Sequence, residues 1–196
     1  LPRVIGPFQE PHTWRVHAYK GVGRLPRGLG LQADPAKRAL LDQLPRLLQG
    51  YGKTPGIDAV LVLLDSDGRD CAVFLRELHG VLANCQPAPA KTLFRLAIEE
   101  MEAWLLGDRN ALLAAYPRAK KDVLARYRQD SICGTWEVLA DAIHPGGHAA
   151  IRTKGWPLNG QIKHEWAARM GPRMDVENNR SPSFCKFRDG LRRWVA

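Results

Sequence analysis

The pattern of apolar and polar positions predicts three β-strands in the first half of the chain. Residues 59–64 form an uninterrupted apolar run that ends in acidic and glycine residues. A run that is apolar on both faces and bounded by turn residues is typical of a buried central strand in a parallel sheet. A second strand is predicted over 92–98, and a half-exposed strand over 13–19, where polar and apolar residues alternate.

Helices are predicted between and after these strands. Apolar residues recur at helical spacing over 36–48 and 71–82, and a further helix over 99–106 directly follows the strand at 92–98. Two successive strand–helix steps favour a parallel sheet with right-handed crossovers. Four more helices, separated by loops, are predicted in the second half of the chain: 110–116, 135–143, 161–170 and 183–195.

The chain of 196 residues suits a single domain. We expect a core over about 10–110 and a helical extension over about 110–196. The chain begins with Leu1 and not with Met, in what looks like the middle of a segment, so we expect N-terminal residues to be missing. No apolar stretch approaches the roughly 18 residues that span a bilayer, which argues against a membrane partner. The four cysteines form no CxxC pair, which favours reduced thiols and a cytoplasmic location.

A cluster of acidic residues directly follows the central strand. Asp65, Asp67 and Asp70 fall within six residues, at the strand end where open α/β sheets place their ligand crevices. Carboxylates this close repel one another unless a cation compensates them, and hard oxygen ligands suit Mg²⁺ or Mn²⁺. The alternative is a solvated turn whose acids cap the next helix.

A second acidic cluster, Glu99, Glu100 and Glu102, follows the strand over 92–98. If the two strands are parallel neighbours, both clusters reach the same edge of the sheet, with carboxylates about 4 to 8 Å apart across a shared metal site. The alternative is a helix start stabilised only by the helix dipole. The predicted metal ligands are Asp65, Asp67, Glu100 and Glu102, supported by Asp70.

The net charge of +9 favours phosphate-rich partners, and nucleic acid, DNA in particular, is the expected one. A basic protein with a local acidic site can hold a polyanion while the carboxylates hold a metal. Lys20, Lys154 and Arg180 are candidates to neutralise phosphate charge in the transition state. A homo-oligomer is left open. Basic residues lie near both ends of the chain: Arg15, Lys20, Arg24, Arg27, Lys186, Arg188, Arg192 and Arg193.

The strand ending in Leu64-Asp65-Ser66-Asp67, together with the second acidic site, resembles the TOPRIM domain of topoisomerases, primases and OLD-type nucleases. More specifically, the chain resembles a family of TOPRIM-like bacterial proteins known as domain of unknown function 4276. The supporting segments span nearly the whole chain in order: 12–21, 65–71, 100–108, 115–117, and 178–184 with Phe187 and Leu191. The Glu-Ala-Trp block at 102–104 and the Asn-Arg-Ser-x-Ser-Phe block at 179–184 are the most specific of them.

The resemblance implies a TOPRIM-like α/β fold, with a mostly parallel sheet flanked by helices and a helical C-terminal extension. It also implies Mg²⁺-dependent phosphodiester chemistry, in which carboxylate-held metals stabilise the attacking and leaving oxygens. An AAA-type ATPase partner and a role in defence against phage or foreign DNA are further expectations. TOPRIM sites usually include a glutamate at the end of a first strand. Residues 1–5 look like the end of the first helix of such a fold, so the resemblance implies that the N-terminal strand and helix are missing from this chain. The glutamate is then missing too, unless Glu10 takes its role.

Two other functions remain open from the sequence. The missing glutamate favours a non-catalytic regulatory or nucleic-acid-binding partner of an ATPase. The Asp65-x-Asp67-Gly68 pattern is also similar to phosphatases of the haloacid dehalogenase type, in which the first aspartate is the nucleophile. Those enzymes usually continue with threonine, whereas this chain has Arg69.

Overall fold

The computed structural model describes residues 1–7, 9–10, 12–19, 21–25, 39–153 and 155–195. The fold is mixed α/β, with a small sheet of two parallel strands and many helices. The chain divides into two compact units, which are treated separately below. The first unit comprises Leu1–Gly6, Asp65–Gly68 and Leu96–Ala196, and the second comprises Pro7–Leu64 and Arg69–Arg95.

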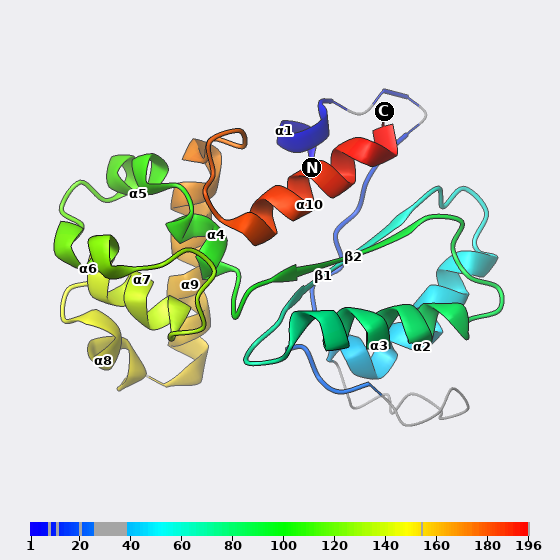
Figure 1. Ribbon diagram of the computed structural model, residues 1–196, viewed down its shortest axis with the longest axis horizontal. Coiled ribbons are helices and arrows are strands. Elements are labelled where there is room, and N and C mark those ends of the chain that lie inside the picture. Colours follow the sequence, from blue (N-terminus) through cyan, green and yellow to red (C-terminus); the bar gives the residue numbers. More distant parts are fainter. Residues whose placement is uncertain (8, 11, 20, 26–38, 154, 196) are drawn as a thin grey trace. The chain divides into compact units, whose positions relative to one another are not determined.

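The sheet pairs β1 (Val60–Asp65) with β2 (Thr92–Ala97), as Figure 1 shows. The amide of Val60 donates to the carbonyl of Lys91, and the amide of Ser66 donates to the carbonyl of Ala97, both at 2.9 Å. The two bonds keep the same offset along both strands, so the strands run parallel. The predictions of strands over 59–64 and 92–98 are confirmed.

In the second unit, α2 (Leu40–Lys53) and α3 (Cys71–Ala83) lie on the same side of the two strands (Figure 1). Both predicted helices are confirmed, although α2 continues to Lys53 rather than ending at 48. The ring of His79 on α3 meets Phe94 on β2 edge-on, with centroids 5.2 Å apart. The apolar stripes of the helices are buried, as their spacing predicted: Leu41, Leu44, Leu48, Phe74 and Leu78.

Two expectations about the strands are wrong. Residues 12–19 have no regular secondary structure, so the predicted strand over 13–19 is not observed. Alternation stabilises a strand only when one face is buried, and here Trp14 and Val16 are 44% and 73% exposed. The central strand is also not buried on both faces. Val62 and Leu64 are buried, whereas Leu61 and Leu63, which alternate with them, are half-buried, so β1 has one core face.

The first unit is mainly helical, and the four helices predicted after residue 110 are all present. Leu112, Leu139, Ile151 and Met170 are fully buried at its core. Among the described residues, three short helices after residue 110 were not predicted: α6 (Lys121–Arg126), α8 (Gly147–Arg152) and the 3₁₀ helix η1 (Gly171–Arg173). Helix α8 begins in a segment that was expected to be a loop. The helices of the unit are α1 (Pro2–Ile5), α4 (Glu102–Leu106), α5 (Arg109–Ala115), α6 (Lys121–Arg126), α7 (Thr135–Ile143), α8 (Gly147–Arg152), α9 (Trp156–Met170), the 3₁₀ helix η1 (Gly171–Arg173) and α10 (Pro182–Val195).

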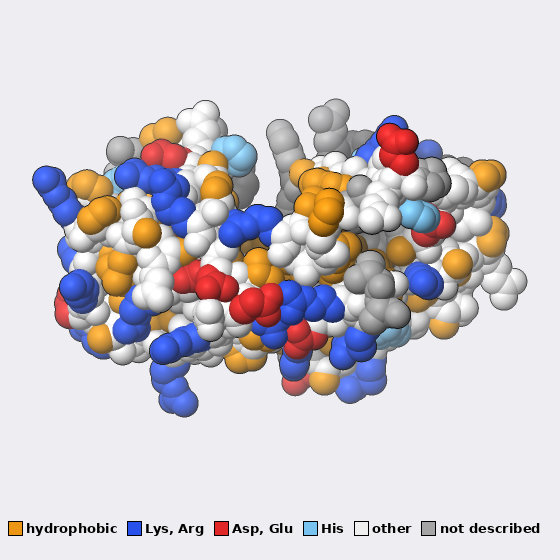
Figure 2. All heavy atoms as spheres, turned by 90° about the horizontal axis from the view of Figure 1, so that it is seen from above, with side chains coloured by type: hydrophobic (Ala, Val, Ile, Leu, Met, Phe, Trp, Pro, Cys, Tyr) orange, Lys and Arg blue, Asp and Glu red, His pale blue; other side chains and the backbone are white. Residues whose placement is uncertain are grey.

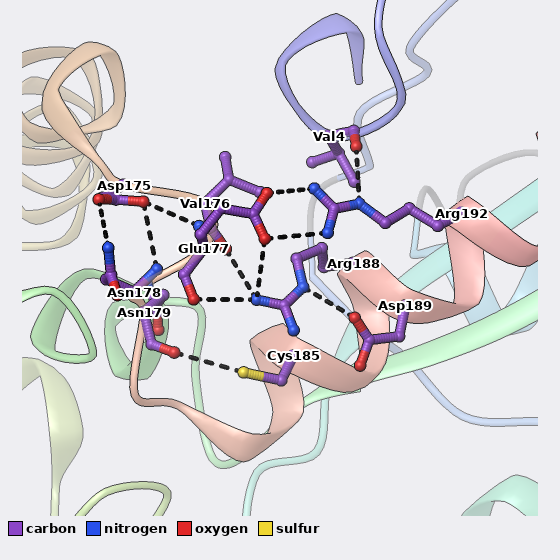
Figure 3. A network of polar contacts seen from close by, with 10 residues as sticks. All are labelled: Val4, Asp175, Val176, Glu177, Asn178, Asn179, Cys185, Arg188, Asp189 and Arg192. Atoms are coloured by element: carbon purple, nitrogen blue, oxygen red, sulfur yellow. Dashed lines mark hydrogen bonds and ion pairs between the residues drawn. The ribbon is translucent and has the colours of Figure 1, made fainter.

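Helix α10 is joined to the preceding turn and to α1 by ion pairs and hydrogen bonds. Arg188 and Arg192 converge on Glu177, and Arg188 also contacts Asp189 at 2.8 Å (Figure 3). The Nε of Arg192 donates to the carbonyl of Val4 at 3.1 Å. Two of the basic residues expected to attract a polyanion are therefore engaged by acidic neighbours.

Charges of both signs are mixed on one face of the molecule. On the face drawn in Figure 2, acidic side chains lie among the Lys and Arg side chains. The net charge of +9 is thus an excess spread over the chain. Among the residues that the structure describes, no helix is both long enough and apolar enough to cross a lipid bilayer.

Candidate functional site

The two acidic clusters meet where the paired strands end, within the first unit. The amide of Asp67 donates to the carbonyl of Glu99 at 2.9 Å, and the amide of Glu99 donates to the hydroxyl of Ser66 at 2.8 Å. Ser66 is fully buried. Asp67 and Glu99 adopt φ angles of 49° and 59°, which non-glycine residues adopt rarely. The sequence prediction that both clusters share one edge is confirmed.

Asp65, Glu100 and Glu102 form a partly buried group of carboxylates at this edge, here called the carboxylate cluster. Glu102 is only 7% exposed. Burial raises the pKa of Asp65 to about 6, and the negative charges of Glu102 and Asp67 contribute to this rise. Burial also raises the pKa of Glu100 to about 7, with Glu102 and Asp65 adding to the effect. The carboxylates therefore repel one another in a site of low polarity.

Lys163 on α9 contacts two members of the cluster. Its Nζ lies 3.4 Å from Oε1 of Glu100 and 3.2 Å from Oε1 of Glu102. Burial lowers the pKa of Lys163, but the charges of Glu102 and Glu100 outweigh it, so the pKa is raised overall. Sequence reasoning missed this residue, because a single lysine on a helix some sixty positions from the glutamates looks like any surface lysine.

Among the residues that the structure describes, two oxygens of the cluster find no hydrogen-bond partner. Oδ1 of Asp65 and Oε2 of Glu100 are both buried and unpaired. An unpaired buried carboxylate oxygen is costly, and hard oxygen donors of this kind suit Mg²⁺ or Mn²⁺. The donor chemistry therefore fits a divalent cation. No group of three or more His, Cys, Asp or Glu side chains is already arranged around a metal position in the described part of the chain.

Two other acidic residues act as helix caps. Oδ1 of Asp70 accepts from the amide of Val73 at 2.8 Å and begins α3, so the capping alternative is confirmed for Asp70. In the first unit, the carboxylate of Glu99 accepts hydrogen bonds from the Gly134 and Thr135 amides at 2.9 and 2.8 Å, at the start of α7. Although burial raises the pKa of Glu99, these bonds and the Thr135 hydroxyl lower it overall.

The predicted start of the helix over 99–106 is wrong. Helix α4 begins at Glu102 instead of at residue 99, because Glu99 has left-handed backbone geometry and Glu100 and Met101 form a turn. The glutamates thus separate into one cap and two members of the carboxylate cluster. The alternative, a helix start stabilised only by the helix dipole, does not explain the contact between Glu100 and Lys163.

The predicted basic residues do not assemble around the cluster. Lys20 and Lys154 lie outside the described residues. Arg180 is exposed, and its backbone amide donates to the carbonyl of Gly107 at 2.9 Å. Within the described ranges its guanidinium forms no ion pair with Asp65, Glu100 or Glu102. Asp67 is exposed to solvent beside the cluster.

The Asn-Arg-Ser-x-Ser-Phe block at 179–184 positions the helix that carries Glu102. Nδ2 of Asn179 donates to the carbonyl of Trp104 at 2.8 Å, and the indole of Trp104 donates to Ser183 at 2.9 Å. Asp130 accepts from the Ser183 amide at 2.6 Å and so caps α10. The two most specific segments of the sequence pattern therefore contact each other.

A separate cavity of about 290 Å³ lies elsewhere in the first unit. The guanidinium of Arg169 stacks over the ring of Tyr116 at 4.6 Å, and Arg118 lines the same cavity. The cavity thus combines an aromatic wall with two cations. Its remaining lining residues are Pro117, Ala119 and Ile143.

Comparisons of the chain with family models, with curated proteins and with solved structures give no match. The TOPRIM-like identity therefore stays a prediction from the sequence.

Proposed function

We propose that the carboxylate cluster binds Mg²⁺ or Mn²⁺ and serves phosphodiester chemistry on nucleic acid, either as a nuclease or as a nuclease-like subunit. The observation that carries the proposal is the pair of buried oxygens on Asp65 and Glu100 that have no hydrogen-bond partner within the described ranges. In a folded protein such groups are normally paired, and a divalent cation would pair both. The metal would supply charge stabilisation for the attacking or leaving oxygen.

The residues of the chain would divide this work. Asp65 and Glu100 would hold the metal through their unpaired oxygens, and Glu102 is close enough to contribute to the negative potential at Asp65. The Trp104–Ser183 contact fixes α4, which carries Glu102. The net charge of +9 supports a polyanionic substrate, with DNA as the first choice.

The wider setting of this function is also part of the proposal. We infer a TOPRIM-like fold from β1, which ends at Asp65 and is followed by Asp67, and from the acidic site after β2. An AAA-type ATPase partner and a role in defence against phage or foreign DNA follow from the same resemblance. A cytoplasmic location is supported by four free cysteines, Cys71, Cys85, Cys133 and Cys185.

The test compares metal binding by the whole chain and by a folded Asp65→Asn/Glu100→Gln variant. Calorimetric titration with Mn²⁺ should show affinity at least about tenfold lower in the variant, since two hard oxygen donors are lost. Glu165→Gln, which removes an exposed carboxylate from α9, is the matched control. Equal Mn²⁺ affinity in the folded double variant and the wild type would overturn the proposed metal site.

A second candidate is a non-catalytic, nucleic-acid-binding partner of an ATPase. It is favoured by the contacts of Lys163 with Glu100 and Glu102, because an ammonium group compensates the charge of these carboxylates without a metal. Nicking of supercoiled DNA with Mg²⁺ or Mn²⁺ separates the two functions. Cleavage that is lost in Asp65→Asn supports the nuclease, and metal-dependent binding without cleavage supports the partner. A phospho-aspartate trapped at Asp65 would instead identify the phosphatase.

A further inference from the structure

The loop between α5 and α6 forms one wall of the cavity of about 290 Å³. It contains a β-turn, in which the amide of Ala119 donates to the carbonyl of Tyr116 at 3.0 Å and Pro117 occupies the second position. The amide of Lys120 donates to the carbonyl of Ala142 at 2.8 Å, which joins the turn to the end of α7. This wall is therefore fixed by the fold itself, and no ordering cost is left for a ligand to meet there.

Two arginines line the cavity, and within the described ranges neither of them is paired with an acidic side chain. Arg118 lies in the turn, and the guanidinium of Arg169 on α9 lies over the ring of Tyr116, 4.6 Å from its centre. Both arginines are exposed. Burial raises the pKa of Tyr116, with Arg169 opposing the rise and Glu165 adding to it, so one acidic residue is also near the ring. An exposed guanidinium without an acidic partner keeps its N–H donors for an external anion.

A third arginine acts on the end of α9. The C-terminus of a helix carries a partial negative charge, which by itself would repel an anion. Nη1 of Arg173 donates to the carbonyl of Arg169 at 2.6 Å and offsets this charge at the last turn of the helix. The helix end therefore does not oppose binding of an anion beside Arg169.

The lining suits a planar ring that is joined to a phosphate. Guanidinium groups bind phosphate oxygens through paired N–H donors, and tyrosine rings and guanidinium planes are both surfaces on which bases stack. Pro117, Ala119 and Ile143 provide the apolar remainder of the lining. The cavity is at the low end of the roughly 300–1,000 Å³ that is typical of ligand pockets, so it suits one nucleotide and not a base pair.

We propose that this cavity binds one unpaired nucleotide, with the phosphate held by Arg118 and Arg169 and the base packed against the Tyr116–Arg169 pair. The inference goes beyond the proposed function, because it needs neither the carboxylate cluster nor a metal. The same chemistry is offered by a free nucleotide and by a nucleotide of a single strand.

The first experiment titrates the full chain by calorimetry with dAMP, with deoxyadenosine and with inorganic phosphate, in the presence of EDTA so that no metal contributes. We expect dAMP to bind at least about fivefold more tightly than either fragment, because base stacking and phosphate contacts both contribute. Inorganic phosphate that binds as tightly as dAMP would overturn the inference, since the cavity would then recognise only an anion. Absence of dAMP binding would overturn it as well.

Substitutions test whether dAMP binds at this cavity. Arg118→Ala and Arg169→Ala should each weaken dAMP binding by at least about fivefold, because a charge-assisted hydrogen bond is lost. Arg126→Ala is the matched control, since Arg126 is exposed, is paired with Asp122 and does not line the cavity. Glu165→Gln should tighten binding, because it removes a negative charge near the ring. Equal dAMP affinity in the wild type, Arg118→Ala and Arg169→Ala would overturn the site.

A second titration, also with EDTA, distinguishes the two sources of the nucleotide. It uses a single-stranded oligo(dA) and the same strand annealed to oligo(dT). A single strand that binds more tightly than dAMP, with the loss in Arg169→Ala, identifies an unpaired strand as the ligand, and the reverse order identifies a free nucleotide. A duplex that binds as tightly as the single strand, with the same loss, would overturn the requirement for an unpaired nucleotide. Because metal is excluded, failure of this site leaves the Mn²⁺ titration of the carboxylate cluster unaffected.

Discussion

The indole Nε1 of Trp104 donates a hydrogen bond to the hydroxyl of Ser183 at 2.9 Å, across 79 positions of the chain. The contact is buried and joins α4 to the first turn of α10. The rings of Phe184 and Phe187 pack on the same indole, with centroids 5.4 and 4.8 Å from it. Because α4 also carries Glu102, this contact fixes one wall of the carboxylate cluster.

Replacing Ser183 with alanine should destabilise the first unit. The substitution leaves the buried indole N–H of Trp104 without an acceptor, a loss that costs about 1–3 kcal/mol. Urea unfolding monitored by tryptophan fluorescence measures the change. Ser131→Ala is the control, because the Ser131 hydroxyl bonds the Arg128 carbonyl in an exposed turn. An equal effect of the two substitutions would contradict the role given to Ser183.

A second stability prediction concerns the close approach of Gly107 to the turn before α10. A Cβ at Gly107 would lie 2.2 Å from Oδ1 of Asn179 and 2.9 Å from the backbone nitrogen of Ser181. Gly107→Ala should therefore force these groups apart and cost about 1–3 kcal/mol.

At Gly160, inside α9, substitution by alanine should instead stabilise the protein. A Cβ there meets nothing within 4 Å, so Gly160→Ala should raise the free energy of unfolding by about 0.5–1 kcal/mol through helix propensity. Thermal unfolding of both variants provides the comparison. If Gly107→Ala is as stable as the wild type, the close contact of Gly107 with Asn179 and Ser181 does not hold the turn before α10 in place.

The elements that the sequence predicted correctly are those whose apolar pattern matches their burial. The apolar run at 59–64 forms most of β1, and the apolar stripe that contains Phe74 and Leu78 lies on α3. The strand predicted over 13–19 failed because alternation alone cannot supply a pairing partner. The start of α4 was misplaced because Glu99 forms a long-range cap, and no local signal announces its partners 34 to 36 positions away.

Only the acidic residues of the candidate site could be predicted from the sequence. Strand ends place Asp65 and the glutamates after β2 at one edge, and this follows from parallel pairing. Lys163 could not be found, since the contact of α9 with α4 is a tertiary one. Asp70 was ambiguous for a different reason, because an aspartate before a helix can be either a cap or a metal ligand. The hydrogen bond that it accepts from the Val73 amide shows that it is a cap.

Nucleic-acid binding should depend on salt and on the cavity that Tyr116 lines. Arg169 and Arg118 present two cations beside an aromatic ring, which suits a phosphate with an adjacent base. Arg169→Ala should weaken binding to single-stranded DNA and reduce the slope of log K against log salt by about 0.7. Arg126→Ala is the control, because Arg126 is paired with Asp122 at 3.2 Å. Equal slopes in both variants would place the contact elsewhere.

The carboxylate cluster should make stability depend on pH in the absence of metal. The pKa values of Asp65 and Glu100 rise from 3.8 and 4.5 to about 6 and about 7 on folding. The folded chain therefore binds more protons than the unfolded chain in this range, and its free energy of unfolding falls as pH rises through it. The loss should be complete above the folded pKa values.

Urea unfolding at about pH 5 and about pH 8 tests this dependence. The difference between wild type and Asp65→Asn/Glu100→Gln isolates the cluster from the other titrating groups, and the variant should lose less stability on going to the higher pH. Saturating Mn²⁺ should reduce the loss in the wild type, because the metal binds the deprotonated carboxylates. Glu165→Gln, on the exposed side of α9, should follow the wild type. If the double variant loses as much stability as the wild type, Asp65 and Glu100 do not hold the extra protons, and the electrostatic strain that the metal is proposed to relieve is absent.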